Sequence, residues 1–512
     1  MPQRPNVLLI TCDQWRGDCL SAAGHPVVRT PNADALAGEG VTFTRHYAGA
    51  APCSPARACI YTGLYQMTNR VCRNGTPMDA RHGNIALAAR ALGYEPTLFG
   101  YTDVSPDPRR HAPEDPVLRS YEGVLPGFAV RQALPEHQKQ WLSWLRLQGL
   151  DPGAGYPDVH RPANGDVSKV SKAPPIYSRE QTPAAFLTGE FVRWLGEQGA
   201  PWFAHISYLS PHPPFIAPEP FNAMYDPAEG PAFRRHADWE AEAAAHPYAA
   251  WELGRQKRKK FLPGHKGKVR DLSEAEFRTI RSIYWGMVSE VDSQLGRVWR
   301  AVKDAGAWDD TVVILTSDHA EMMGDHFMLG KGGYFDQSYH LPLIVRAPGA
   351  SARGVTVDAF TEAVDIAPTL IDLMEGQVPA HLDGRSLAPF VAGQPPGTWR
   401  DCAHWEFDFR AVADGNQPFG LKPQQCNLAV ARTARWKYVH FGGGLPPLLF
   451  DLENDPCEVE NLAGDPAHRG TRLEMAERLL AWRAEHLDES LALAELTEDG
   501  IAGSFAGTFW HG

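Results

Sequence analysis

Runs of mostly apolar residues, each ending in polar side chains, recur along the chain. They lack polar/apolar alternation, which is typical of strands buried on both faces of a parallel sheet, and they cover residues 6–11, 94–99, 202–210, 311–317 and 341–346. Between them, segments with helical character cover residues 31–40, 84–92, 183–198 and 273–298. Strands that alternate with helices predict an α/β fold with a large, mostly parallel central sheet.

The pattern changes after about residue 383. Short segments with turns between them predict antiparallel strands at 429–433, 437–441 and 447–451, and a charged amphipathic helix is expected at 472–496. We therefore predict a catalytic α/β domain at 1–382 and a smaller α+β subdomain at 383–512, with an antiparallel sheet, a helix and a tail. Two stretches rich in Pro, Gly and charge, about 105–180 and 221–272, are interpreted as insertions in the first domain.

The overall charge argues against nucleic acid as a partner. The 512 residues carry a formal net charge of −12, which disfavours a general nucleic-acid binder. One basic run, Arg255–Lys260, stands out in the second insertion. A nucleic-acid patch is one reading of it, but an isolated basic run in an acidic protein is more often a solvated face, and we favour that interpretation.

The cysteines and the first residues indicate the compartment. Eight cysteines are scattered without paired spacing, which is typical of reduced thiols in the cytosol. The apolar run at 7–11 is too short for a signal-peptide core or a membrane span. We expect a cytoplasmic protein that does not bind a membrane.

Cys53 lies where a helix is expected to begin. Pro55 suits the first turn of a helix, because its missing N–H would have no partner there. Cys53 would then face free N–H groups that attract anions, with Arg57 one turn further on the same face. A lone cysteine in such a place is more often simply buried, so the interpretation depends on what lies nearby.

Two strand ends carry possible metal ligands. Asp13 and Gln14 follow the first apolar run, and Asp318 and His319 follow the run at 311–317. Ligands in open α/β sheets gather at the carboxyl ends of the strands, although a solvated carboxylate in a turn is an equally ordinary reading of Asp13 alone. Acid and imidazole ligands together suit a transition ion better than Ca²⁺.

The segment from Cys53 to Arg57 resembles the Cys-x-Pro-x-Arg signature of the formylglycine-dependent sulfatase family. His212, Lys331 and the C-terminal stretch 449–456 extend the resemblance over most of the chain. It implies the alkaline-phosphatase-like α/β sandwich and an active site built on position 53. It also implies that a maturation enzyme oxidises Cys53 to formylglycine, whose hydrate is the nucleophile.

Three departures distinguish this chain from ordinary sulfatases. Tyr101 and Thr102 follow Gly100 where sulfatases usually carry Lys and His, Gln14 stands for an aspartate, and His319 stands for an asparagine. These residues look like the phosphonate monoester hydrolase and phosphodiesterase branch of the family. That resemblance also places Asn74, with Tyr101 and Thr102, at the substrate.

The resemblance implies one divalent metal ion at the carboxyl edge of the sheet. Mn²⁺ is the expected ion, with Zn²⁺, Fe²⁺ or Ca²⁺ as alternatives. Its ligands would be Asp13, Gln14, the converted Cys53, Asp318 and His319.

The expected mechanism follows from the chemistry of an aldehyde hydrate. The metal lowers the pKa of one hydroxyl, which attacks phosphorus or sulfur in line. The metal, Arg57 and Lys331 hold the non-bridging oxygens, and His212 protonates the leaving oxygen. Release then breaks a C–O bond as the carbonyl reforms.

Small phosphonate monoesters and phosphodiesters are the expected substrates, with promiscuous hydrolysis of sulfate esters. An arylsulfatase or alkyl sulfatase is the alternative. A non-enzymatic binding protein is the third possibility, but such a protein would have lost Cys53, Arg57 or a metal aspartate, and all are present.

The C-terminal tail suggests self-association. Phe505, Phe509 and Trp510 lie in a segment too rich in glycine to form its own core, and three aromatic side chains are costly to leave in water. We expect a homo-oligomer, a tetramer or a dimer, with the insertions and tail packed against neighbouring subunits.

Overall fold

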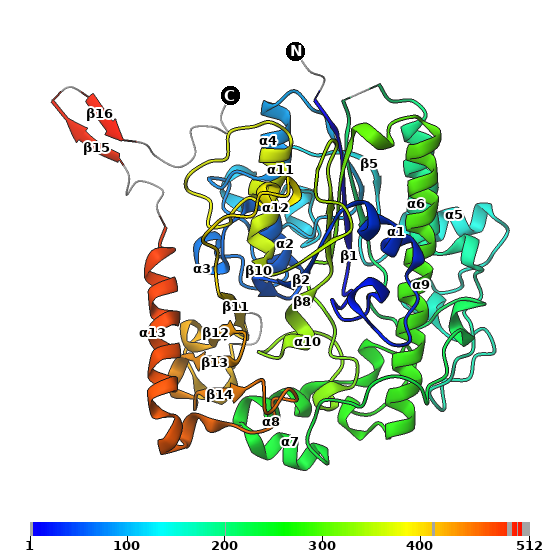
Figure 1. The fold of residues 1–512 in the computed structure, drawn as a ribbon. Coiled ribbons are helices and arrows are strands. Elements are labelled where there is room, and N and C mark those ends of the chain that lie inside the picture. Colours follow the sequence, from blue (N-terminus) through cyan, green and yellow to red (C-terminus); the bar gives the residue numbers. More distant parts are fainter. Residues whose placement is uncertain (1–3, 200, 412–414, 489–493, 499, 504–512) are drawn as a thin grey trace.

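A nine-stranded mixed sheet runs through the centre of the protein (Figure 1). The computed structural model describes residues 4–199, 201–411, 415–488, 494–498 and 500–503. The strand order is β10-β2-β9-β7-β1-β6-β4-β5, and β8 pairs with β2. The strands are β1 (Asn6–Cys12), β2 (Val41–Tyr47), β4 (Pro96–Gly100), β5 (Ala129–Ala133), β6 (Phe203–Tyr208), β7 (Thr311–Thr316), β8 (His340–Leu341), β9 (Leu343–Arg346) and β10 (Val355–Glu362).

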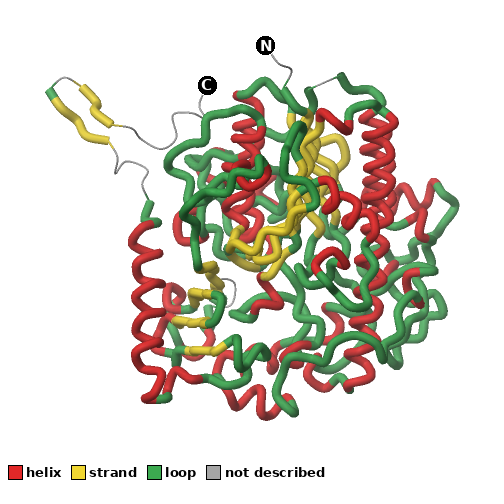
Figure 2. The backbone as a smooth tube through the Cα atoms, in the orientation of Figure 1, coloured by secondary structure: helices red, strands yellow, loops and turns green. Residues whose placement is uncertain are grey.

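The middle of the sheet is parallel, as predicted. β1 lies between β6 and β7, and all three run in the same direction, with Leu9 opposite His205 and Ile314. Every residue of β1 is buried, because helices cover both faces of the sheet (Figure 2). Alternate side chains therefore enter two separate cores: Leu8 and Ile10 enter one, and Val7 and Leu9 enter the other.

Helices form the outer layers. α6 and α9 cover one face, while α2, α4 and α11 cover the other (Figure 1). The longest, α9, begins after a capping box in which Ser273 and Glu276 satisfy each other's backbone N–H groups. The helices are α1 (Pro31–Glu39), α2 (Cys53–Thr62), α3 (Gln66–Asn69), α4 (Ile85–Ala91), α5 (Lys139–Leu147), α6 (Pro183–Leu195), α7 (Trp239–Ala245), α8 (Pro247–Arg255), α9 (Glu274–Asp304), α10 (Asp336–Tyr339), α11 (Ile366–Leu373), α12 (Ala388–Val391) and α13 (Arg469–Glu485).

A second sheet joins the C-terminal segment to the start of α2. Its order is β14-β13-β12-β11-β3, and the strands are β3 (Ala50–Ala51), β11 (Cys402–Asp408), β12 (Asn427–Thr433), β13 (Trp436–Phe441) and β14 (Leu448–Asp451). β3 lies just before Cys53 and pairs in parallel with β11, Ala51 opposite Phe407. The C-terminal segment thus pairs with the short strand that leads to the candidate nucleophile. The domain boundary at 382/383 stays a prediction.

Several local expectations differ from the structure. The stretch 105–180 is not wholly irregular, because β5 extends the central sheet and α5 packs against α6 through Trp144 and Phe186. The sequence does not predict β5 because it is an edge strand whose side chains are partly exposed, so it lacks a continuous apolar run. The expected helix 472–496 ends at Glu485, and the hairpin β15 (Ala494–Thr497) and β16 (Gly500–Gly503) follows. Phe505, Phe509 and Trp510 lie outside the described residues.

No helix among the described residues is long and apolar enough to cross a bilayer. All eight cysteines are described, and each is a free thiol.

Candidate active site

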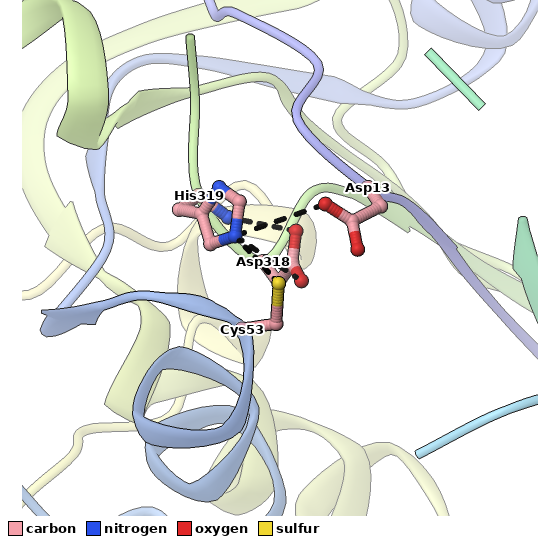
Figure 3. Close-up of side chains that lie close together, drawn as sticks. All are labelled: Asp13, Cys53, Asp318 and His319. Atoms are coloured by element: carbon pink, nitrogen blue, oxygen red, sulfur yellow. Dashed lines mark hydrogen bonds and ion pairs between the residues drawn. The ribbon is translucent and has the colours of Figure 1, made fainter. Parts of the chain in front are cut away.

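Four side chains converge at the carboxyl edge of the central sheet. Asp13 follows β1, Cys53 is the first residue of α2, and Asp318 and His319 follow β7. One ligand atom from each lies within 4.8 Å of every other, and all four are buried (Figure 3). Parallel strands with a shared edge bring the two strand ends together, as predicted. The helix start adds the cysteine.

These residues fit a divalent cation. Asp13 Oδ1 is buried without a hydrogen-bond partner among the described residues. His319 Nδ1 lies 3.2 Å from the Ala320 carbonyl oxygen. That oxygen can only accept, so Nδ1 carries the proton of the neutral ring and Nε2 has a lone pair. That Nε2 is 3.1 Å from Cys53 Sγ and 3.7 Å from Asp13 Oδ1. Burial lowers the pKa of His319 to about 4, so the neutral ring is a ligand and two carboxylates supply charge.

Gln14 lies against this cluster in a left-handed backbone conformation, with φ 65°. Its N–H donates to Asp318 Oδ1 over 3.4 Å. Its side-chain oxygen accepts a hydrogen bond from Lys331 Nζ at 2.5 Å, and its side-chain amide donates to Glu321. Glu321 therefore determines which end of the Gln14 amide faces the site.

Arg57 does not take the position expected of it. The guanidinium is fully buried, and its N–H groups donate to protein: Nε to Asp318 Oδ2 at 2.9 Å, Nη1 to Ser207 Oγ at 2.8 Å and Nη2 to the Tyr101 hydroxyl at 2.8 Å. It also lies over the Tyr101 ring, 4.1 Å from the centroid. Arg57 thus supports the cluster from beneath and does not line the cavity. The reason is its place one turn into α2, below the helix end.

Of the three expected substrate contacts, two face the cavity. Tyr101 lines it and donates its hydroxyl to Asp13 Oδ2. Asn74 lines it and accepts the Ser54 N–H at 3.0 Å, one of the free donors at the start of α2. Thr102 does not take the expected place at the substrate, because it is fully buried and does not line the cavity. Its hydroxyl donates to the Gly123 carbonyl at 3.0 Å and accepts the Leu125 N–H at 2.8 Å.

His212 and Lys331 both line the cavity, as expected. His212 Nδ1 lies 2.6 Å from the Pro213 carbonyl, so the proton sits on Nδ1 and Nε2 is an acceptor. Burial, and after it Lys331, lower the pKa of His212 below its usual value. A neutral ring of this kind contacts the substrate as an acceptor. The expected role of proton donor is not supported by this arrangement.

The cluster opens into a cavity of about 1020 Å³. One wall comes from the Tyr101 loop, a second from the C-terminal segment around Phe407 and Arg410, and a third from residues 251–263 of the second insertion. The pairing of β3 with β11 places the C-terminal wall. The last two walls were not anticipated from the sequence.

Sequence reasoning also missed three side chains close to the cluster. Glu321 holds Gln14, Ser207 accepts from Arg57, and Asp103 accepts the Ser54 hydroxyl at 2.9 Å while lining the cavity. Asp103 and Glu321 follow strand ends that the sequence had already indicated, and Ser207 lies within the last two residues of β6. The spacing of Glu321, three residues after Asp318, was therefore a signal that could have been read.

The family comparison agrees with this geometry. The sequence matches the family model for sulfatases over residues 5–376 and the model for the N-sulphoglucosamine sulphohydrolase C-terminal region over 324–485. The chain belongs to the sulfatase family. Membership of this family implies a metal ion and a formylglycine, and the four-residue cluster is the candidate place for both.

Two curated relatives match along almost their whole length. The multifunctional alkaline phosphatase superfamily protein PehA of Trinickia caryophylli is 39% identical, over 97% of this chain and 99% of that protein. An arylsulfatase of Clostridium perfringens is 27% identical, over 95% of each chain.

Two solved structures are very similar to this sulfatase-family chain. The phosphonate monoester hydrolase of Agrobacterium radiobacter is 58% identical with a TM-score of 0.95, over 98% of this chain and 100% of that one. The phosphonate monoester hydrolase SpPMH of Silicibacter pomeroyi is 38% identical with a TM-score of 0.92, over the same shares. The alkaline-phosphatase-like α/β fold predicted from the sequence is confirmed.

Proposed function

We propose that this hydrolase cleaves phosphonate monoesters and phosphodiesters, with promiscuous activity on sulfate esters. The observation that carries the proposal is the placement of Cys53 Sγ, at the start of α2 and 3.1 Å from His319 Nε2, inside a cluster of metal-ligating side chains. Tyr101, in the position where sulfatases usually have a lysine, bonds Asp13 instead of presenting a cation. The likeness to two phosphonate monoester hydrolases supports the substrate class.

Formylglycine at position 53, made by a maturation enzyme, would supply a hydrated aldehyde as nucleophile. A divalent ion held by Asp13, Gln14, Asp318 and His319 would lower the pKa of its hydroxyl. We propose Mn²⁺, because a mixed oxygen and nitrogen set suits a first-row ion.

The remaining side chains position and neutralise the reacting group. Lys331 brings an ammonium to the cavity edge beside Gln14, where it can bind a non-bridging oxygen. The start of α2 adds the positive end of the helix dipole, which favours an anion. Asn74 orders the Ser54 end of that helix, and Arg57 holds Asp318 and Tyr101 in place.

The test compares matched p-nitrophenyl esters of sulfate, phosphate, phenylphosphonate and phenyl phosphate. We expect kcat/KM for the phosphonate monoester and the diester to exceed that for sulfate by about tenfold, which needs ~1.4 kcal/mol of differential transition-state binding. Cys53→Ala should abolish turnover. Cys59→Ala removes a buried thiol from the same helix and is the matched control.

The same protein should carry a Cys53 peptide about 18 Da lighter than the thiol form, since sulfur is exchanged for oxygen and two hydrogens are lost. Full activity from protein with an intact thiol would contradict the nucleophile.

An arylsulfatase is the second candidate. A sulfate monoester has the same single charge as a phosphodiester, and the Clostridium relative is named an arylsulfatase. If the sulfate ester led the series above, this second function would replace the first.

We also propose a cytoplasmic homo-oligomer. Eight free thiols fit a reducing compartment. The hairpin β15–β16 stands clear of the body in Figure 1, where a neighbouring subunit could cover it. Sedimentation at micromolar concentration should give a dimer or tetramer, and a monomer would contradict this part of the proposal.

A further inference from the structure

The side chains of the basic run in the second insertion do not all face the same way. Arg255, Lys259 and Lys260 line the same cavity as Cys53, whereas Lys257 is exposed outside it. All four of these side chains are exposed, so the expected solvated face is present, and three of its cations also line the cavity. Arg258 turns the other way and anchors the loop, with Nε donating to the Lys268 carbonyl at 3.0 Å.

Hydrogen bonds hold this wall in a fixed position relative to the catalytic end. Gln256 donates to Glu252 Oε1 at 2.9 Å, and its own side-chain oxygen accepts the Leu329 N–H at 3.1 Å. Leu329 is two residues before Lys331, so the basic run is tied to the loop that carries the catalytic lysine.

A second tie joins the basic wall to the His212 loop. The Phe261 carbonyl accepts the Phe215 N–H at 2.9 Å, and the two rings stack with centroids 6.1 Å apart. The position of the cations is therefore built into the fold.

Of the two lysines of the wall, Lys260 is close to Glu252, but that carboxylate pairs with Arg255. Arg255 pairs with Glu252 at 2.6 Å and lies 4.5 Å from the Trp251 ring centroid. Lys259 and Lys260, by contrast, make no ion pair within the part of the chain that the structure describes. Burial, and after it Arg255, lower the pKa of Lys260. Cations of this kind favour an anion.

The acids on the other cavity walls are already engaged. Asp408 pairs with Arg410 at 2.5 Å. Glu136 accepts hydroxyl hydrogen bonds from Tyr121 at 2.7 Å and Tyr156 at 3.0 Å. These two carboxylates therefore have partners other than the lysines of the basic wall, although they keep their negative charge.

The cavity is also larger than the minimal substrates need. Its volume of about 1020 Å³ is at the upper end of the range that encloses a whole drug-sized ligand. A simple phenyl ester at Cys53 would fill only part of this cavity.

We propose that Arg255, Lys259 and Lys260 form a second anion-binding subsite at the cavity mouth, which takes a carboxylate or phosphate carried by the substrate away from its scissile ester. The inference rests on the hydrolase function proposed above and narrows its substrate class to diesters and phosphonate monoesters with a distal negative charge. Trp251, which lines the same cavity beside Arg255, adds an aromatic surface.

The test uses two diesters of p-nitrophenol that differ only in a carboxylate on the second phenyl ring. Wild-type enzyme should show a higher kcat/KM for the charged diester, mostly through KM. K259Q/K260Q should lower that value about tenfold, because each partly exposed pair contributes roughly 0.7 kcal/mol. The neutral diester should change less than about twofold. Lys257→Gln, an exposed lysine of the same run that does not line the cavity, is the matched control and should change neither.

Salt provides an independent check, since an exposed subsite is screened. The advantage of the charged diester should shrink at high ionic strength in the wild type and be absent throughout in K259Q/K260Q. An equal loss on both diesters, or the same loss in Lys257→Gln, would overturn the subsite.

Measurements of binding affinity test the anion subsite separately from the proposed hydrolase function. The affinities of alkane bisphosphonates of increasing length are compared with those of the matching monophosphonates by calorimetry. A bisphosphonate advantage that K259Q/K260Q removes would support the subsite even if neither diester were hydrolysed, a result that would defeat only the hydrolase assignment. Equal affinities at every length would overturn the subsite while leaving that assignment intact.

Discussion

Replacing Glu321 with glutamine should loosen the metal, although Glu321 is not a ligand. Its two carboxylate oxygens accept three hydrogen bonds: Oε2 from the Gln14 amide, and Oε1 from the N–H groups of Met323, at 3.2 Å, and Gly330. A glutamine can accept on one side only. With its oxygen kept on the two backbone N–H groups, its own N–H₂ would face the N–H₂ of Gln14.

Gln14 can avoid that clash only by turning its amide over. Its N–H₂ would then point at Lys331, and its oxygen would leave the site where it now accepts the Lys331 hydrogen bond. One hydrogen bond to a charged group is worth about 1.5–3 kcal/mol. The expected loss of metal affinity is therefore about tenfold to a hundredfold, the range seen when a partner of a metal ligand is removed.

The assay is metal affinity by competition with a chelator, and Glu290→Gln is the control. Glu290 is a second buried glutamate, on α9, which accepts from Thr182 at 2.6 Å and Gln294 at 3.2 Å away from the cluster. Its variant should lose stability but keep metal affinity.

The double variant Q14E/E321Q tests directly whether residue 321 orients residue 14. Its new carboxylate can accept from both the new amide and Lys331, so it should recover metal affinity lost in E321Q. If E321Q binds metal as wild type does, or if the double variant is no better than the single one, Glu321 does not orient Gln14.

Three further predictions concern separate parts of the molecule. His319→Ala should lower metal content as well as turnover, whereas His205→Gln, a buried histidine on β6 outside the cluster, should not change metal content; stoichiometric metal in the first variant would refute the ligand assignment. Arg57→Lys should reduce stability by about 3 kcal/mol in urea unfolding, because it leaves Asp318, Ser207 and Tyr101 with too few donors, and an unchanged midpoint would contradict that role. Burial lowers the pKa of His160 to about 3 from 6.5, so the unfolded state takes up a proton first and the free energy of unfolding falls as pH drops from about 6.5 towards 3, by up to about 1.4 kcal/mol per unit. His160→Gln should flatten that slope, and an unaltered slope would show that other groups cause it.

The sequence was sufficient to predict the four-residue cluster because the cluster depends on which strands are neighbours and in which direction they run. Asp13 and Asp318 each end a buried strand, and β1 and β7 turned out to be parallel neighbours. Any pair of such strands brings its ends to one edge. The helix start at Cys53 was equally readable from Pro55, and α2 begins at that residue.

Thr102 shows where such reasoning fails. Neighbouring side chains in a loop can point to opposite sides, and here the backbone of Asp103 is left-handed, with φ 53°. Tyr101 and Asp103 line the cavity, and Thr102 between them turns to the Gly123 loop. A prediction that takes adjacent residues together must place one of them wrongly. Only the path of the chain after β4 decides which one.

The basic wall could not be predicted because it depends on contacts between distant segments. Composition alone correctly noted that a charged run in a protein of net charge −12 is usually solvated. What changes the outcome is the hydrogen bond from Leu329 to Gln256, which joins two segments that are 73 positions apart. A net charge describes the field far from the protein, whereas a substrate in the cavity meets Lys331, Lys259 and Lys260 on the walls of one cavity. An acidic protein can therefore hold a doubly anionic substrate, provided that its cations lie beside the two charged groups of that substrate.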